Sequence, residues 1–367
     1  IVVLERRAAL KSWVVVLSIT TFTLSMCGTF LVRSGILNSV HTFANDPARG
    51  IFILIFLFIL IVLSLGIFFI FYKENDKKSF NFFWLSRETS ILINNWFMMY
   101  FLSVILIGTI YPIFLDVISG DKISVGPPFY QKLIAPFLIP FLIFMSLGPR
   151  LKWIKSKIDN KNSLLITFIT SAALTFFIIK NLTNDLLFYT VLVSAAFFLF
   201  FTTLKELFIK KSDNRSQTVA HFGFSLLILS ILFNNILSSE IITNIKIGEK
   251  YIYNKSEIFF KKIEEKKEKN FNSIIAHFEI KDENGRTIKL KPEIRVYNQP
   301  VTITSEADIK TTLLEDKFLV MNLVKGNEYF NIRYQVKPFM IWIWISVLLL
   351  SFGGLMSLFK KRNEKKT

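Results

Sequence analysis

The chain has 367 residues, of which 52% are hydrophobic and 40 are Phe, and its mean hydropathy is +0.47. This composition excludes an ordinary soluble protein with one core and indicates that lipid is the main solvent. The formal net charge is +17, but Lys and Arg punctuate apolar runs instead of gathering on one domain. The pattern argues against a nucleic-acid partner and is typical of a membrane protein.

Eight apolar runs are long enough to cross about 30 Å of hydrocarbon as helices. The fourth run is short and contains Pro136 and Pro140, which favours a kinked or partly re-entrant helix. We therefore expect an α-helical polytopic membrane protein. The runs are residues 13–32, 51–72, 91–111, 133–147, 164–179, 186–204, 219–237 and 338–359.

Basic residues near the ends of these runs predict the orientation, because Lys and Arg resist translocation. They concentrate in 6–11, 73–87, 150–161, 205–215 and 360–366, whereas the short loops between those segments hold few. We expect both chain ends to be cytoplasmic, in a bacterial inner membrane or, as the alternative, in the mitochondrial inner membrane.

Between the last two runs, polar residues alternate with Ile, Phe, Tyr and Val, which predicts β-strands. Asn284 and Gly285 are the pair that a two-residue type I′ hairpin requires. The charged run 261–270 is predicted to be a solvated loop. We expect six to eight strands in a small sandwich or barrel on the outer side. The predicted domains are a membrane domain over 1–237, with the His41 loop outside, a periplasmic β domain over 238–337, and a last helix with a basic tail over 338–367.

Few motifs for chemistry occur in the sequence. It contains no phosphate-binding GxxxxGK[ST], no GxGxxG after a strand and no HExxH. The one cysteine, Cys27, lies in an apolar run, so no intrachain disulfide or CxxC pair can form.

The three histidines are therefore the main candidates. His41 lies in a loop expected outside the membrane, where an imidazole can ligate iron or be a plain polar residue. His221 begins an apolar run, and an ionisable residue inside a span is by default a functional candidate. His277 alternates on a predicted strand and is interpreted as structural. Arg33 and Arg49 bracket the His41 loop and suit either a carboxylate partner, such as a haem propionate, or snorkelling toward head groups.

Several stretches of the chain carry a family resemblance. They are GTFLVRSG at 28–35, SVHTFA at 39–44, DPARG at 46–50, SRE at 86–88, NN at 94–95, GTIYP at 108–112, GPPF at 126–129, VAHFG at 219–223 and KPFMIWIW at 337–344. In this order they resemble the C-terminal portion of the CcmF family of cytochrome c maturation proteins.

The resemblance implies a haem lyase. Haem delivered by the chaperone CcmE would be joined by thioether bonds to the CxxCH motif of an apocytochrome c, alongside thiol-handling subunits of the CcmH and CcmI type. His41 matches a catalytic ligand of the incoming haem iron. His221 matches an axial ligand of a permanent haem b in the membrane, and Arg33 and Arg49 are candidates for haem propionates.

The chain departs from the family pattern in one respect, because it contains no Trp-Trp-Asp motif. We expect that motif and one further ligand of each haem to lie upstream, and we interpret the chain as a fragment or a processed half. The nitrite-reductase haem lyase subunit is a variant of the same class. Two other classes stay open, a transporter or channel and a non-catalytic assembly scaffold.

Overall fold

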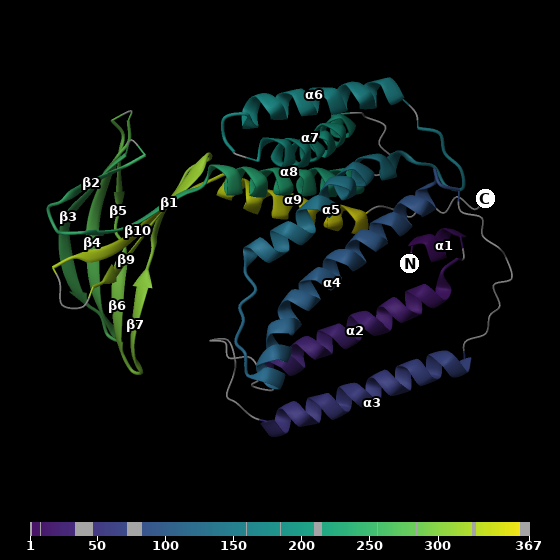
Figure 1. Ribbon diagram of the computed structural model, residues 1–367, viewed down its shortest axis with the longest axis horizontal. Coiled ribbons are helices and arrows are strands. Elements are labelled where there is room, and N and C mark those ends of the chain that lie inside the picture. The colour runs from purple at the N-terminus through teal and green to yellow at the C-terminus, as the bar shows by residue number, and fades with distance from the viewer. Residues whose placement is uncertain are drawn as a thin grey trace. The chain divides into compact units, whose positions relative to one another are not determined.

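The computed structural model describes residues 2–7, 9–33, 47–71, 83–158, 160–183, 185–208, 215–254, 256–283, 285–324 and 328–359 (Figure 1). The chain divides into two compact units, Ile1–Lys161 and Asn162–Thr367. Among the described residues, eight helices are long and apolar enough to cross a membrane, which confirms the predicted number.

The first unit is helical. Its elements are α1 (Val2–Arg7), α2 (Lys11–Arg33), α3 (Pro47–Phe71), α4 (Arg87–Ser119), α5 (Pro127–Leu147) and the short 3-10 helix η1 (Gly148–Arg150). The α4 helix is longer than its apolar run. Ser86 caps its start by accepting from the Thr89 backbone N–H at 3.2 Å, and Gly120 ends it with a φ of +74°. The caps at Ser86 and Gly120 stabilise helical turns on both sides of the apolar run 91–111.

The fourth span is one continuous helix of 21 residues, α5, so Pro136 and Pro140 do not interrupt it. A proline inside a helix removes one backbone donor and disturbs the carbonyls of the preceding turn. The Tyr100 hydroxyl of α4 donates to the Leu133 carbonyl in the turn before Pro136, at 2.9 Å. A neighbouring helix thus adds a hydrogen bond to the backbone of the turn before the proline.

A buried carboxylate joins the start of α4 to the segment after η1. Glu88 is 1% exposed, and its two carboxylate oxygens each accept from the Ile154 backbone N–H at 3.0 Å. The backbone N–H of Arg87 donates to the Lys152 carbonyl at 3.0 Å beside it. These contacts hold the basic loop against the helix start, where a carboxylate is also favoured by the helix dipole.

The second unit contains α6 (Lys161–Ile179), α7 (Leu186–Phe208), α8 (Arg215–Leu237) and α9 (Met340–Leu358). Glycines bring α8 and α9 close together. A Cβ atom on Gly223 would lie 2.9 Å from the Leu350 backbone nitrogen, and one on Gly353 would lie 2.9 Å from Cα of Ala220. Small residues at a helix contact permit the close packing that drives association in membranes.

Replacing Gly353 by leucine is expected to separate α8 from α9 and to destabilise the protein, by about 1–3 kcal/mol if the core overpacking range applies. The measurement is the thermal unfolding midpoint of the purified protein in detergent. Gly354→Leu is the matched control, because a Cβ at Gly354 meets nothing within 4 Å. Equal midpoints for the two variants would contradict the close contact.

The segment of the sequence between α8 and α9 forms a two-sheet sandwich, which lies beyond one end of these two helices (Figure 1). One sheet has the order β1-β10-β9-β8, and the other β2-β3-β4-β6-β7 with β5 paired to β4. The strands are β1 (Ser239–Ile245), β2 (Lys250–Tyr253), β3 (Ser256–Lys267), β4 (Phe271–Lys281), β5 (Thr287–Leu290), β6 (Glu293–Asn298), β7 (Val301–Glu306), β8 (Asp308–Thr311), β9 (Glu315–Leu323) and β10 (Phe330–Pro338).

The sandwich core follows the predicted alternation. Phe260 and Phe278 stack with ring centroids 4.4 Å apart, and Leu319, Ile332 and Tyr334 are buried from the opposite sheet. The predicted β domain is confirmed as a sandwich, but the expected six to eight strands are too few, since ten are described. Short strands such as β2 and β8 bury little and leave a weak pattern in the sequence.

The prediction of a loop at 261–270 is wrong, because β3 runs to Lys267 and pairs with β4 as far as Asn272. The side chains of 261–267 are mostly exposed, so this half of β3 lies outside the core that Ile258 and Phe260 of the same strand enter. Opposite charges face each other across the hairpin, as in Lys261 and Glu279 at 3.0 Å. Backbone hydrogen bonds and cross-strand ion pairs stabilise the strand over 261–267, where few side chains are buried.

The hairpin at 282–286 also differs from its prediction. Gly285 has a φ of +74°, its N–H donates to the Asp282 carbonyl at 2.9 Å, and the Asp282 N–H donates to the Arg286 carbonyl at 3.0 Å. Three residues therefore lie inside the closing pair, as in a turn followed by a left-handed glycine, instead of the two of a type I′ turn. Asn284 lies outside the described residues.

Candidate functional site

His221 is the candidate site residue that the structure describes in full. It lies in the second turn of α8, close to the buried residues Thr218, Gly223 and Ser225. Its side chain is half-buried, and within the described part of the chain no residue forms a hydrogen bond with it. A polar group of this kind in an apolar helix is costly unless it gains a partner. The imidazole is thus free to ligate.

The packing of α8 leaves His221 on a face of its own. Ala220 contacts α9 at Gly353, and Phe222 packs on Phe200 of α7 with ring centroids 5.2 Å apart. Successive helix residues are turned by roughly 100° about the axis. The contacts with α9 and α7 therefore occupy two faces, and His221 lies on the third.

The other predicted site residues are placed less completely. His41 lies outside the described residues, and so does most of the loop that contains it. Arg33 is the last residue of α2, and Arg49 lies in the first turn of α3. Arg33 and Arg49 belong to the first compact unit, and His221 belongs to the second.

His277 has the structural role that its alternating strand predicts. Its Nε2 lies 3.0 Å from Oε2 of Glu264, which lies diagonally across the β3–β4 hairpin, since the residue directly opposite His277 is Lys262. The side chain is 18% exposed, and its partner is 52% exposed. A cross-strand pair thus accounts for this histidine.

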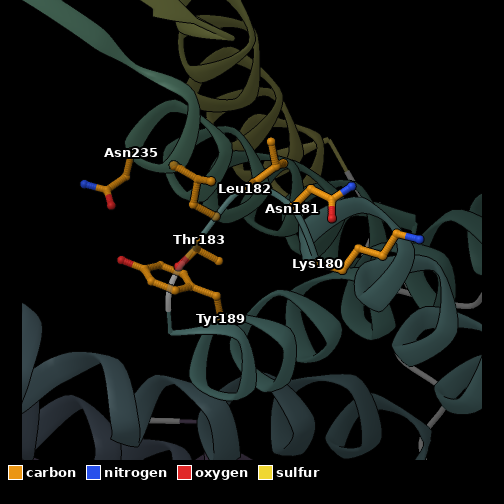
Figure 2. Close-up of a pocket in the computed structure, with 7 residues that line it drawn as sticks. Lys180, Asn181, Leu182, Thr183, Tyr189 and Asn235 are labelled. Carbon is orange, nitrogen blue, oxygen red and sulfur yellow. The ribbon is translucent and has the colours of Figure 1, made fainter.

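A second feature of the helical part is an open pocket of about 480 Å³ at the α6–α7 turn and the end of α8. Figure 2 shows Tyr189 and Asn235 directing their polar ends to one side, and Lys180 directing its ammonium to the other. The seven lining residues include no histidine, cysteine or methionine. Sequence reasoning did not identify this pocket, because its two parts, residues 180–189 and 235–236, are far apart in the sequence.

The described residues contain no group of three or more His, Cys, Asp or Glu that would hold a metal ion by themselves. Among the described residues, His221 therefore offers a single nitrogen donor and does not belong to a site of several protein ligands. One imidazole in an apolar helix fits a single protein ligand of a haem iron, because haem supplies the equatorial ligands itself. The donor set of this chain thus fits one side of a haem.

Eight membrane-crossing helices, a sandwich inserted before the last of them and a single unpaired histidine in a span define a polytopic membrane protein with a candidate haem-ligating site. Residues 236–338 match the family described as the CcmF C-terminal beta-sandwich. Nearly the whole chain is similar to cytochrome c-type biogenesis proteins named CcmF.

The similarity extends over nearly all of the chain. The cytochrome c-type biogenesis protein CcmF of Escherichia coli (strain K12) is 30% identical over 373 residues, which are 99% of this chain and 58% of that protein. CcmF of Pseudomonas fluorescens is 31% identical, over 99% of this chain and 57% of that protein. A solved structure named Cytochrome c Heme Lyase CcmF has the same fold, with a TM-score of 0.72 at 21% identity, over 96% of this chain and 55% of that one. The chain thus spans a little more than half the length of these relatives.

Proposed function

We propose that this chain is part of a haem lyase that attaches haem to apocytochrome c on the outer face of the membrane. The half-buried, unpartnered His221 in a helix of a CcmF relative is the observation that carries this proposal. Each thiol of a CxxCH motif adds across a haem vinyl group, so that an S–C bond forms and the thiol proton goes to the other vinyl carbon. This addition needs no net oxidant.

The residues of the chain have separate roles in this proposal. His41 ligates the iron of the incoming haem, which is the substrate, and Arg33 or Arg49 pairs with its propionates. His221 would hold the iron of a resident haem b, and such a haem would supply redox chemistry to the site.

The orientation and the partners belong to the same proposal. The distribution of Lys and Arg supports cytoplasmic chain ends and an outer sandwich in a bacterial inner membrane. On that side the chain would meet the haem chaperone CcmE, the apocytochrome and thiol-handling subunits of the CcmH and CcmI type. Lipid surrounds the eight spans.

The test is complementation. A bacterial host that lacks its own CcmF receives this chain together with the part of the host CcmF that the chain does not span, and holocytochrome c is measured by haem staining after denaturing electrophoresis. Restoration of covalent haem is expected, because thioether bonds survive denaturation and non-covalent haem does not. Accumulation of both proteins in the membrane without covalent haem would contradict the proposed activity and favour a scaffold.

A further inference from the structure

Two short segments meet where α4 begins and where the chain leaves η1 (Figure 1). They are residues 83–87 and 152–157, and we call the surface that they form the junction surface. The backbone N–H of Ser156 donates to the Leu85 carbonyl at 2.8 Å, and the N–H of Arg87 donates to the second segment as well. The spans of α4 and α5 reach these segments, so the junction surface lies at the end of two spans.

Ile154 has a strained backbone within this surface. Its φ is +71°, and the Lys155 N–H donates to the Trp153 carbonyl at 3.0 Å, which closes a three-residue turn. A positive φ is costly for a β-branched residue and persists only where other contacts hold it. The buried Glu88 carboxylate is such a contact, because it accepts from the Ile154 N–H. The Ile154 side chain is 49% exposed, so the turn presents an apolar side chain outside the core.

The junction surface exposes further large apolar side chains. Trp84 is 89% exposed, and Phe83 and Leu85 are 44% and 49% exposed. Such side chains are costly in water, but Trp is enriched at the level of the lipid headgroups, where its amphipathic ring is favoured. At the end of two spans, these side chains therefore fit contact with lipid at the membrane surface.

The same two segments are strongly basic. Their charged residues are Arg87, Lys152, Lys155 and Lys157. The adjacent carboxylate, Glu88, is 1% exposed and accepts from the backbone, so it leaves the surface positive. Lys155 and Lys157 are exposed and form no ion pair with any residue in the described ranges. The Lys155 Nζ lies 5.3 Å from the centroid of the Phe83 ring, so one ammonium lies beside the apolar side chains.

An anionic phospholipid complements both properties of the junction surface. Its phosphate accepts hydrogen bonds from ammonium groups, and its acyl chains contact apolar side chains. Clusters of Lys and Arg next to a span are typical of sites for anionic lipids. An acidic segment of a partner protein would match the lysines, but it would leave Trp84 and Ile154 without an apolar contact.

We propose that the junction surface binds an anionic phospholipid such as phosphatidylglycerol. Lys155 and Lys157 hold the phosphate, and Phe83, Trp84 and Ile154 contact the glycerol backbone and the first part of the acyl chains. None of the candidate haem ligands takes part in this binding, so its test does not depend on haem attachment.

The experiment uses the full chain, purified in detergent and supplied with phosphatidylglycerol or phosphatidylcholine of the same acyl composition. Bound lipid is counted by native mass spectrometry. Preferential binding of phosphatidylglycerol is expected, because both lipids carry a phosphate but only phosphatidylglycerol has a net negative charge. The double variant Lys155→Gln/Lys157→Gln should bind phosphatidylglycerol about 30-fold more weakly, which is roughly a factor of five for each lysine at an anionic lipid surface.

The double variant Lys122→Gln/Lys132→Gln is the matched control. These two exposed lysines lie near the opposite ends of α4 and α5, so the control loses the same charge outside the junction surface. It should keep the preference for phosphatidylglycerol. Without added lipid, both double variants should unfold at the same temperature, because all four side chains are exposed.

Brominated acyl chains, which quench nearby tryptophans, test the apolar part of the site. Brominated phosphatidylglycerol should quench Trp84 more strongly than brominated phosphatidylcholine does. Trp96, which is 77% exposed within α4, should be quenched equally by both lipids. Each contribution is the fluorescence that Trp84→Phe or Trp96→Phe removes.

Equal binding of the two lipids, or an unchanged preference in Lys155→Gln/Lys157→Gln, would overturn the proposal. Displacement of phosphatidylglycerol by inorganic phosphate would overturn it in favour of a site for the anion alone. Binding of a glutamate-rich peptide that displaces the lipid and needs the same lysines would overturn it in favour of a protein partner.

Discussion

Replacing His221 by alanine in the complete protein is expected to remove the b-type α band from the reduced absorption spectrum. A low-spin b haem needs an axial ligand on each side, and alanine has no donor atom. Cytochrome c maturation should fall to the level of the host that lacks the protein. The measurements are the dithionite-reduced spectrum of the purified protein and haem staining of the membrane fraction.

His277→Ala is the matched control for this prediction. It also removes an imidazole, but one that pairs with Glu264 in the sandwich, so the spectrum should stay complete. The His221→Ala variant should unfold at nearly the same temperature as the unsubstituted protein without haem, because His221 makes no hydrogen bond with the described residues. A full b-type spectrum in His221→Ala would exclude it as a ligand.

Replacing His41 by glycine is expected to stop maturation while the b-type spectrum stays intact. The proposal assigns His41 to the incoming haem and His221 to the resident one, so the two losses should be separable. An empty coordination position on the iron can also be filled by a small free ligand. Added imidazole should therefore restore part of the maturation in His41→Gly, and none in His221→Ala if the buried site admits no free imidazole.

Two outcomes would contradict the role of His41. Normal maturation in His41→Gly would show that the residue ligates no essential iron. Loss of the b-type spectrum in the same variant would show that His41 belongs to the resident haem. Each is read from the same two measurements, covalent haem by staining and resident haem by absorption.

Membrane spans and the sandwich are predictable from the sequence because both depend on local composition. An apolar run such as 51–72 has to be a helix in lipid, since no water satisfies its backbone. The period-two alternation at 293–297 likewise has to be a strand with one buried face. Neither inference needs to know what the segment packs against.

Errors arose where packing or pairing overrides local composition. Pro136 and Pro140 favour a kinked or re-entrant segment, but both lie inside the continuous α5, and Tyr100 of another helix donates to the backbone in the turn before Pro136. The charges of 261–267 predict a loop, but the strand opposite supplies hydrogen bonds and counter-ions. In each case the deciding partner is distant in sequence, so a local pattern could not reveal it.

For the candidate residues too, some properties are visible in the sequence and others only in the tertiary structure. The sequence by itself identified His221, because a histidine at the edge of an apolar run stands out against its neighbours. Only the tertiary structure showed that its neighbours Ala220 and Phe222 pack on α9 and α7, and that Tyr334, Lys317 and Asp282, from three separate strands and turns, line one pocket. Composition determines which segments enter lipid or form a sheet, whereas a site depends on side chains that folding alone brings within a few ångströms of one another.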